Sequence, residues 1–428
     1  MWNKSHIPRR ALDFSPKRCT PEDVSALAKQ LGSKQPIDII AQIPPKTGRR
    51  YIVVGGAGFL GGWIVVQLLR RGEDPRCIRV LDIRLPVRHD LKFGVGKDVH
   101  YIQVDVSNAE AVQKAFTAPW PEGSSTSSPI SIFHTAANIR FYERSASLIP
   151  NSTRVNVDGT QNIIDSARSI GASTLVYTSS GSVGVHSSRF LLRPWQSEPE
   201  HFVQAINDDD NQKRVRASDK LESGSGTLRT GCIRPGNGVF GPGGDMLCGA
   251  YLVRQFNPTW ISNIVSHFRL RGEFSNPDIG GQSFTIADPG VPPTYGDVYR
   301  TLETLSNGQT YFPEFIPPIN GDLVNLQPSL FNLTMVHLIF DDSRARLPPE
   351  KGGLGYKGAW TTLEGLHKTY EEHVKGMNAS TTTISFAESV SVRSLSVDMA
   401  AAAIPLAPMD VLNLHGAMHH AFAHGCPT

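Results

Sequence analysis

Residues 51–62, YIVVGGAGFLGG, decide the fold of this chain. The run Tyr51–Val54 predicts a buried strand, and the apolar run 63–69 predicts a helix. Between them stand three glycines at a spacing of three: Gly55, Gly58 and Gly61. This order is typical of a turn where the backbone approaches a pyrophosphate and a helix N-terminus offers its N–H groups. The stretch therefore predicts a dinucleotide site, with an ordinary βαβ unit packed through its glycines as the alternative.

An acidic residue stands where the ribose of such a cofactor would be bound. The second apolar run, 77–81, ends at Asp82, twenty-one residues after Gly61. A carboxylate there accepts a hydrogen bond from the ribose 2′-hydroxyl and repels a 2′-phosphate, which favours NAD over NADP. Arg84 is the complication, because its guanidinium is able to pair with that phosphate.

Further apolar runs continue the pattern. Residues 100–104, 130–133 and 174–178 predict strands that alternate with helices, so we expect an α/β fold with a doubly wound parallel sheet. Ligands of such sheets bind beyond the carboxyl ends of the strands. Three residues follow strand ends there: Asp105, Ala136 and Ser180. Asp105 is placed to meet an adenine amino group, or else to cap the next helix, and small residues around Ala136 let the backbone lie against a cofactor.

Composition narrows the function classes. The chain has 428 residues, 39% of them hydrophobic and 19% charged, which is typical of a globular protein. A net charge of +3 does not favour a nucleic-acid partner. Five scattered cysteines without a C-x-x-C pair predict reduced thiols in a cytosolic protein. The sequence contains no run of eighteen apolar residues, so we expect no membrane-spanning helix.

The chain is predicted to have four parts. They are an N-terminal extension, 1–49; a dinucleotide-binding domain, 50–240; a smaller substrate lobe, 241–376; and a disordered tail, 377–428. In the extension, residues 1–19 predict a disordered basic arm, and Thr20, Pro21 and two acids predict a helix start. The tail holds four histidines without an acid or cysteine pattern, so we expect no metal site.

Seven motifs together resemble the extended short-chain dehydrogenases, and among them the 3β-hydroxysteroid dehydrogenase family with its sterol-4α-carboxylate 3-dehydrogenases. The motifs span about residues 50–375: GGAGFLG, LDIR, HTAA, VNVDGTQN, YTSSGSV, GCIRPGNGVFGPGGDM and DIGGQSFTIADPG. The resemblance implies a Rossmann-type sheet, NAD(P) and oxidation of a 3β-hydroxyl on an apolar polycyclic substrate, with loss of a 4-carboxylate where one is present. It implies that Ser180 is the catalytic serine and that Pro235 lies beside the nicotinamide.

The same resemblance implies a catalytic Tyr-x-x-x-Lys pair, and here the chain departs from it. The interval 181–226 contains no tyrosine. If Lys220 is the family lysine, Arg216 occupies the tyrosine position, and an arginine stays protonated and cannot act as the base. A substitute base would be Tyr142, His186 or a water molecule.

Three hypotheses about the function of the chain follow. The first is a dehydrogenase acting on a sterol or triterpenoid, the second a sugar-nucleotide epimerase or dehydratase, and the third a dinucleotide-binding protein without catalysis. The apolar stretch 313–340 predicts a lobe core or, alternatively, a sterol-sized mouth or a peripheral contact with the endoplasmic reticulum membrane. Association as a homodimer is a further expectation for this family.

Overall fold

The computed structural model describes residues 7–33, 45–125, 127–139, 146–186, 188, 195–196, 198–208, 228–236, 281–307, 336–358, 360–372 and 374. The chain divides into two compact units, residues 1–376 and 377–428, and everything described belongs to the first. The predicted disordered tail and its histidines therefore lie outside the described residues, as do Tyr142, Lys220 and most of the apolar stretch 313–340.

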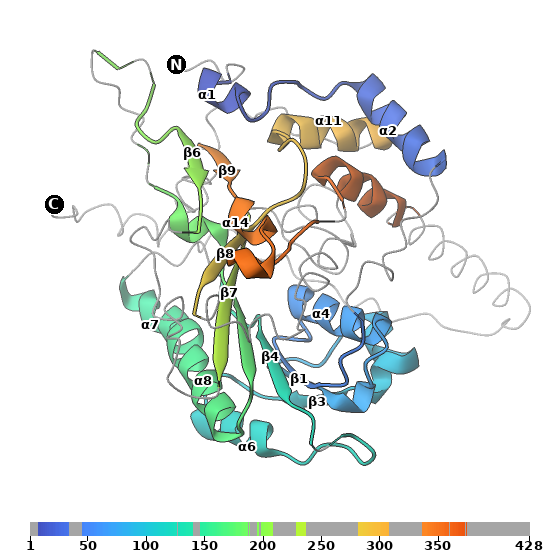
Figure 1. The fold of residues 1–428 in the computed structure, drawn as a ribbon, viewed down its shortest axis with the longest axis vertical. Helices are drawn as coiled ribbons and strands as arrows, with labels where there is room; N and C mark the ends of the chain where they lie inside the picture. Colours follow the sequence, from blue (N-terminus) through green and yellow to red (C-terminus); the bar gives the residue numbers. More distant parts are fainter. Residues whose placement is uncertain are drawn as a thin grey trace, which may run out of the picture. The chain divides into compact units, whose positions relative to one another are not determined.

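A seven-stranded parallel sheet forms the centre of the first unit (Figure 1). Its strand order is β3-β2-β1-β4-β5-β7-β8, with the reversal between β1 and β4 that defines a Rossmann-type fold. The strands are β1 (Arg50–Val54), β2 (Ile78–Asp82), β3 (His100–Gln103), β4 (Ile130–His134), β5 (Thr174–Thr178), β7 (Arg229–Pro235) and β8 (Ser283–Ile286). The predicted fold class and strand runs are confirmed.

Two hydrophobic cores cover the two faces of this sheet. Tyr51 and Val53 of β1 pack in one core, and Ile52 and Val54 pack in the other, as the alternation of side chains along a strand requires. The first core takes side chains from helix α4 (Phe59–Arg70), and the second takes them from α6 (Ala109–Thr117) and α8 (Gly159–Ser169). Figure 1 shows α4 on one side of the strands and α6 and α8 on the other. The sheet is therefore doubly wound.

Strand β8 comes from the segment 241–376, which the sequence assigns to a substrate lobe. It pairs with β7 over Cys232–Pro235, so the boundary at 240 falls between two neighbouring strands of one sheet. The division into a dinucleotide domain and a substrate lobe stays a prediction.

A second, two-stranded parallel sheet was not predicted. It consists of β6 (Val203–Ile206) and β9 (His337–Phe340). Val185, Ile206 and Val336 form a small core beneath it, with Leu338 and Phe340 packed against them. Residues 336–340 are the described part of the apolar stretch 313–340. Val336 is buried in this small core, and Leu338 and Phe340 are half-buried against it.

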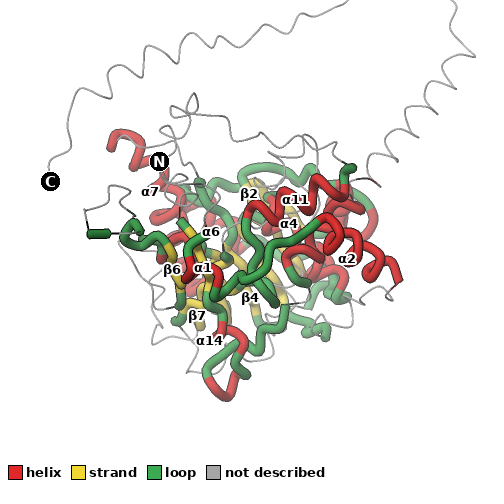
Figure 2. Tube along the Cα trace, turned by 90° about the horizontal axis from the view of Figure 1, so that it is seen from above, coloured by secondary structure: helices red, strands yellow, loops and turns green. Residues whose placement is uncertain are grey.

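The described part of the N-terminal extension contains two helices, α1 (Arg9–Leu12) and α2 (Pro21–Ser33). Thr20 and Asp23 form a reciprocal capping box at the start of α2, which confirms the predicted helix start. The disordered arm predicted for 1–19 is wrong over its described part, 7–19, because these residues bond to the segment 292–300. Helix α2 lies along α11 (Tyr295–Leu305), as Figure 2 also shows.

The other described helical segments are short or irregular. Between β4 and β5, α7 (Ile149–Thr153) runs through a π-helical turn at Arg154–Asp158 into α8. Short α-helices lie at α5 (His89–Lys92) and α14 (Ser343–Arg346), and a closing helix lies at 362–372, as predicted. No described helix is long and apolar enough to cross a membrane.

Candidate functional site

The glycine turn between β1 and α4 is shaped so that no side chain fits at two of its positions. Gly55 has a φ of +82°, and a Cβ on it would come within 2.7 Å of the Ala136 backbone nitrogen. A Cβ on Gly61 would overlap the carbonyl oxygen of Gly55. Gly58 is the N-cap of α4, and no side chain caps that helix. The turn therefore presents bare backbone and an uncapped helix N-terminus, which is the anion-binding arrangement that the sequence predicts.

Asp82 ends β2 beside this turn. Its Oδ2 accepts a hydrogen bond from the Ala57 N–H at 3.0 Å, and its Oδ1 accepts one from the Arg84 N–H at 3.0 Å. These two bonds fix the carboxylate against the glycine turn, with only 8% of the residue exposed. Each oxygen keeps a lone pair, so the group remains able to accept a hydrogen bond from a ribose hydroxyl.

The end of β4 carries the small residues that face the turn. Thr135 donates its hydroxyl to the Val54 carbonyl at 2.9 Å, which ties the start of this loop to β1. Asn156, buried in the π-helical turn, accepts from the Asn138 N–H at 2.7 Å and donates to the Asn138 carbonyl at 3.0 Å. The loop around Ala136 is thus held at both ends. π-Helical turns are frequent at functional sites.

Asn156 was missed as a functional candidate although its motif, VNVDGTQN, carries part of the resemblance. The signal was available, because a polar amide between two valines in a helical pattern needs a partner when it is buried. Next to it, Thr160 donates to the Asn156 carbonyl and contacts Nε2 of His134 at 3.0 Å. His134 is fully buried, and desolvation lowers its pKa to about 4.

Ser180 follows β5 and starts a 3₁₀ turn at Gly181–Gly184. Its hydroxyl accepts from the Ser182 N–H at 3.2 Å and lies 2.9 Å from the Ser182 hydroxyl. The residue is partly exposed, so its hydroxyl can turn toward a ligand. Behind it, a Cβ on Gly181 would come within 2.5 Å of the Phe340 ring and 3.1 Å of the Pro235 carbonyl oxygen. Ser180, Pro235 and β9 thus meet at one place.

Strand register shows that these residues share one edge of the sheet. Val54 of β1 lies beside Leu81 and His134, and His134 lies beside Tyr177 of β5. The predicted residues that follow these positions are therefore brought together: Gly55, Gly58, Gly61, Asp82, Ala136, Ser180 and Pro235.

Asp105 is at the same edge but is exposed. Its Oδ1 accepts from both the backbone N–H and the hydroxyl of Ser107, which forms a local turn. The alternative that Asp105 caps the next helix is wrong, because Asn108 caps α6 by accepting from the Ala111 N–H. A contact between Asp105 and an adenine stays a prediction.

Of the proposed proton-handling groups, only His186 is described. Its backbone N–H donates to Gln204 Oε1 at 2.8 Å, and its ring stacks on His201 with 4.6 Å between centroids. The structure therefore anchors the chain at His186 to β6, a few residues beyond Ser180.

The family profile of the 3-beta hydroxysteroid dehydrogenase/isomerase family matches residues 52–266, which is half of the chain. The chain belongs to the 3-beta hydroxysteroid dehydrogenase/isomerase family. The match begins inside β1, so the extension 7–33 precedes the part that the family shares.

Curated relatives agree with this family. The chain is 30% identical over 289 residues to 3beta-hydroxysteroid-dehydrogenase/decarboxylase isoform 2 of Arabidopsis thaliana, covering 64% of this chain and 46% of that protein. It is 32% identical over 212 residues to 3 beta-hydroxysteroid dehydrogenase type 7 of Mus musculus, covering 47% and 53%. A decarboxylating sterol-4-alpha-carboxylate 3-dehydrogenase of Schizosaccharomyces pombe is 28% identical, covering 55% and 69%. The match thus spans about half the length of the first two relatives.

Solved structures share the fold. A UDP-glucose 4-epimerase of Thermotoga maritima superposes with a TM-score of 0.52 at 15% identity, covering 77% of this chain and 99% of that one. An epimerase of Methanothermobacter thermautotrophicus gives a TM-score of 0.52 at 16% identity, covering 81% and 98%. At this identity the likeness concerns the Rossmann-type architecture alone.

Proposed function

We propose that the chain is an NAD-dependent oxidoreductase that oxidises the 3β-hydroxyl of a sterol-type or triterpenoid-type substrate. Family membership is the observation that carries this proposal, and the bare glycine turn beside the fixed carboxylate of Asp82 supports it. NAD, when bound, would supply the nicotinamide that takes up the hydride. Where the substrate bears a carboxylate at C4, oxidation at C3 gives a β-keto acid, which loses carbon dioxide readily.

The chain's own residues would divide the work by position. The backbone from Gly55 to Gly61 and the N-terminus of α4 would hold the pyrophosphate, and Asp82 would accept from the ribose 2′-hydroxyl. Ala136, in the loop that Asn156 holds through the Asn138 backbone, would lie against the cofactor. Pro235 would lie beside the nicotinamide, and Asp105 near the adenine.

Ser180 would donate its hydroxyl to the substrate oxygen and stabilise the charge that develops there when the hydroxyl proton leaves. Lys220 would orient the nicotinamide ribose. The base is the open part of this mechanism, because the interval 181–226 has no tyrosine. Tyr142, His186 or a water molecule would take the proton.

A second candidate function follows from that same absence. A dinucleotide-binding protein without turnover would keep the glycine turn and Asp82 while lacking the catalytic tyrosine, as this chain does. A sugar-nucleotide epimerase remains the enzymatic alternative, because such enzymes share the fold but act on a polar substrate.

The proposal is tested by measuring NADH formation with a panel of 3β-hydroxysterols, with and without a 4-carboxylate. Ser180→Ala and Ser125→Ala, an exposed serine in the loop before β4, form a matched pair of variants. We expect turnover that Ser180→Ala removes and Ser125→Ala preserves. Binding of NAD without turnover across the panel would favour the non-catalytic reading, and turnover on sugar nucleotides alone would favour the epimerase.

A further inference from the structure

The segment 7–33 lies outside the family match, yet it is bonded to the body of the chain. Its helix α2 runs along α11, more than 260 residues later in the sequence. Helix α11 follows β8, the last strand of the main sheet. The extension therefore ties the start of the chain to the side of the sheet beyond β7.

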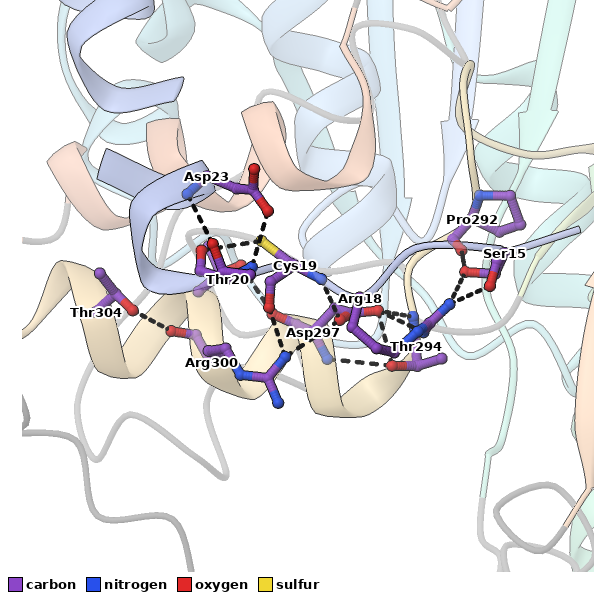
Figure 3. A network of polar contacts seen from close by, with 11 residues as sticks. Ser15, Arg18, Cys19, Thr20, Asp23, Pro292, Thr294, Asp297, Arg300 and Thr304 are labelled. Atoms are coloured by element: carbon purple, nitrogen blue, oxygen red, sulfur yellow. Dashed lines mark hydrogen bonds and ion pairs between the residues drawn. The ribbon is translucent and has the colours of Figure 1, made fainter. Parts of the chain in front are cut away.

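One buried carboxylate joins the two segments (Figure 3). Asp297 completes the capping box at the start of α11, because its Oδ2 accepts from the backbone N–H and the hydroxyl of the N-cap residue Thr294. The same Oδ2 accepts from Arg18 Nη1 at 2.7 Å, and Oδ1 accepts from the Cys19 N–H at 2.8 Å. Asp297 is only 2% exposed, so this carboxylate depends on the extension for the charge that faces it from outside the helix.

Three more bonds flank this carboxylate. The Ser15 hydroxyl donates to the Pro292 carbonyl at 2.7 Å and accepts from Arg18 Nη2 at 2.7 Å. On the other side, Arg300 Nη1 donates to the Cys19 carbonyl at 2.5 Å. Donors and acceptors thus cross between the extension and the segment 292–300 in both directions, as Figure 3 shows. Such a two-way pattern fixes the register of the two segments.

The segment that the extension bonds is in turn tied to the end of β9. The Ala287 N–H, in the chain that leads from β8 to Pro292, donates to Asp342 Oδ2 at 3.2 Å, two residues after β9. Phe340, the last residue of β9, packs against Gly181 and Gly236, directly behind Ser180 and Pro235. A series of contacts therefore leads from Arg18 through Ser15 and the segment 287–292 to β9, and from there to the turn that carries Ser180.

We infer that residues 7–33 are a strap that holds α11 and β9 in place and thereby positions the Ser180 turn, with Arg18 as its positioning residue. The strap, as defined by these residues, acts on the substrate side of the site. None of the four bonds that join the strap to the segment 292–300 involves the glycine turn or Asp82. Its release should loosen the substrate side and leave dinucleotide binding intact.

Amide hydrogen exchange of the full chain tests this without any need for turnover. The variant is Arg18→Ala. Its matched control is Lys17→Ala. This variant also removes one positive charge, but the ion pair that it breaks, Lys17 with Asp23, lies within the extension. Arg18→Lys is the conservative rescue. We expect Arg18→Ala to raise exchange about tenfold or more in residues 295–300 and 336–340 and in the turn 181–186, because a hydrogen bond to a charged group is lost.

In β1 and β4 exchange should stay within about twofold of wild type, as should the Kd for NAD. Lys17→Ala should match wild type, and Arg18→Lys should restore part of the protection. Exchange that rises only in 15–20 and 295–300 would overturn the inference, as would a uniform rise across the main sheet. Where turnover is present, Arg18→Ala should raise the KM for the sterol and leave the KM for NAD unchanged. A wild-type chain without turnover would count against the proposed function, while the exchange result would still decide the role of the strap.

Discussion

The two sides of the site are built in opposite ways. The cofactor edge comes from consecutive segments, where β1, the glycine turn, α4 and β2 follow one another within residues 50–82. The other side, which we predict to take the substrate and call the substrate side, comes from distant segments, since Ser15 bonds to Pro292 and Arg18 bonds to Asp297. Between them stands Ser180, which follows a strand of the main sheet but rests on Phe340 of the second sheet.

This difference has physical consequences. Backbone geometry defines the cofactor edge. A single added Cβ at Gly55 or Gly61 would collide with neighbouring atoms, so we expect small substitutions there to impair dinucleotide binding. Polar pairs between separate segments define the substrate side, so it can loosen without unfolding the sheet. We therefore predict that variants of the cofactor edge will weaken dinucleotide binding, whereas variants of the substrate side will affect turnover and leave dinucleotide binding unchanged. Four variants test this, from the largest expected effect to the smallest.

Removing the hydroxyl of Ser180 should have the largest effect. In the proposed oxidation, Ser180→Ala takes away a donor to the developing oxyanion, and kcat should fall by roughly 10²–10³. Binding of NAD, measured by fluorescence titration, should change little, because the proposed role of Ser180 is in catalysis and not in binding the dinucleotide. Loss of NAD affinity of the same size would erase the distinction between the two sides.

Changing Asp82 to alanine should alter cofactor choice. The variant loses a charge-assisted hydrogen bond to the ribose, so NAD should bind about 10- to 100-fold more weakly. Removal of the negative charge should at the same time narrow the gap between NAD and NADP, with Arg84 now facing the 2′-phosphate. Titration of both dinucleotides measures the ratio. An unchanged ratio would remove Asp82 from the ribose site.

A methyl group at Gly61 should strain the cofactor edge. Gly61→Ala drives a Cβ into the carbonyl oxygen of Gly55, and we expect a loss of roughly 1–3 kcal/mol in the free energy of unfolding, with weaker NAD binding. The matched control is Gly32→Ala at the end of α2, where a Cβ meets nothing within 4 Å. Urea denaturation compares the two, and equal effects would contradict the packing argument.

Lowering the pH should reduce the free energy of unfolding, because His134 is buried in its neutral form. Its pKa is about 4 in the folded chain and about 6.5 when unfolded, so the stability it contributes is full above pH 6.5 and is lost as pH falls toward 4. Between pH 7 and pH 5 this amounts to about 2 kcal/mol. His134→Gln should flatten that part of the pH profile of unfolding, and His89→Gln, at an exposed position, should leave it intact. A profile unchanged by His134→Gln would refute the assignment.

The sequence predicted the cofactor edge well because its signals are local. Strand, glycines and acid lie within about thirty residues, and the turn geometry requires those residue types at those places. Asp105 was less certain, since an acid after a strand serves a local turn as readily as a ligand, and here it bonds to Ser107.

The substrate side was predicted poorly because its signals are not local. Nothing in the basic run at 7–19 indicates that Arg18 faces Asp297, and nothing near residue 203 or 337 indicates that β6 and β9 pair across more than 130 residues. Asn156 lies between these cases, because its partner is only eighteen residues away, but its buried position becomes visible only in the folded chain.

We propose that the cofactor edge of this chain binds NAD whether or not its predicted substrate side supports catalysis. Isothermal titration of the full chain with NAD and with NADP tests it most directly. We predict saturable binding of one NAD per chain and weaker binding of NADP. No binding of either dinucleotide, or tighter binding of NADP than of NAD, would contradict it.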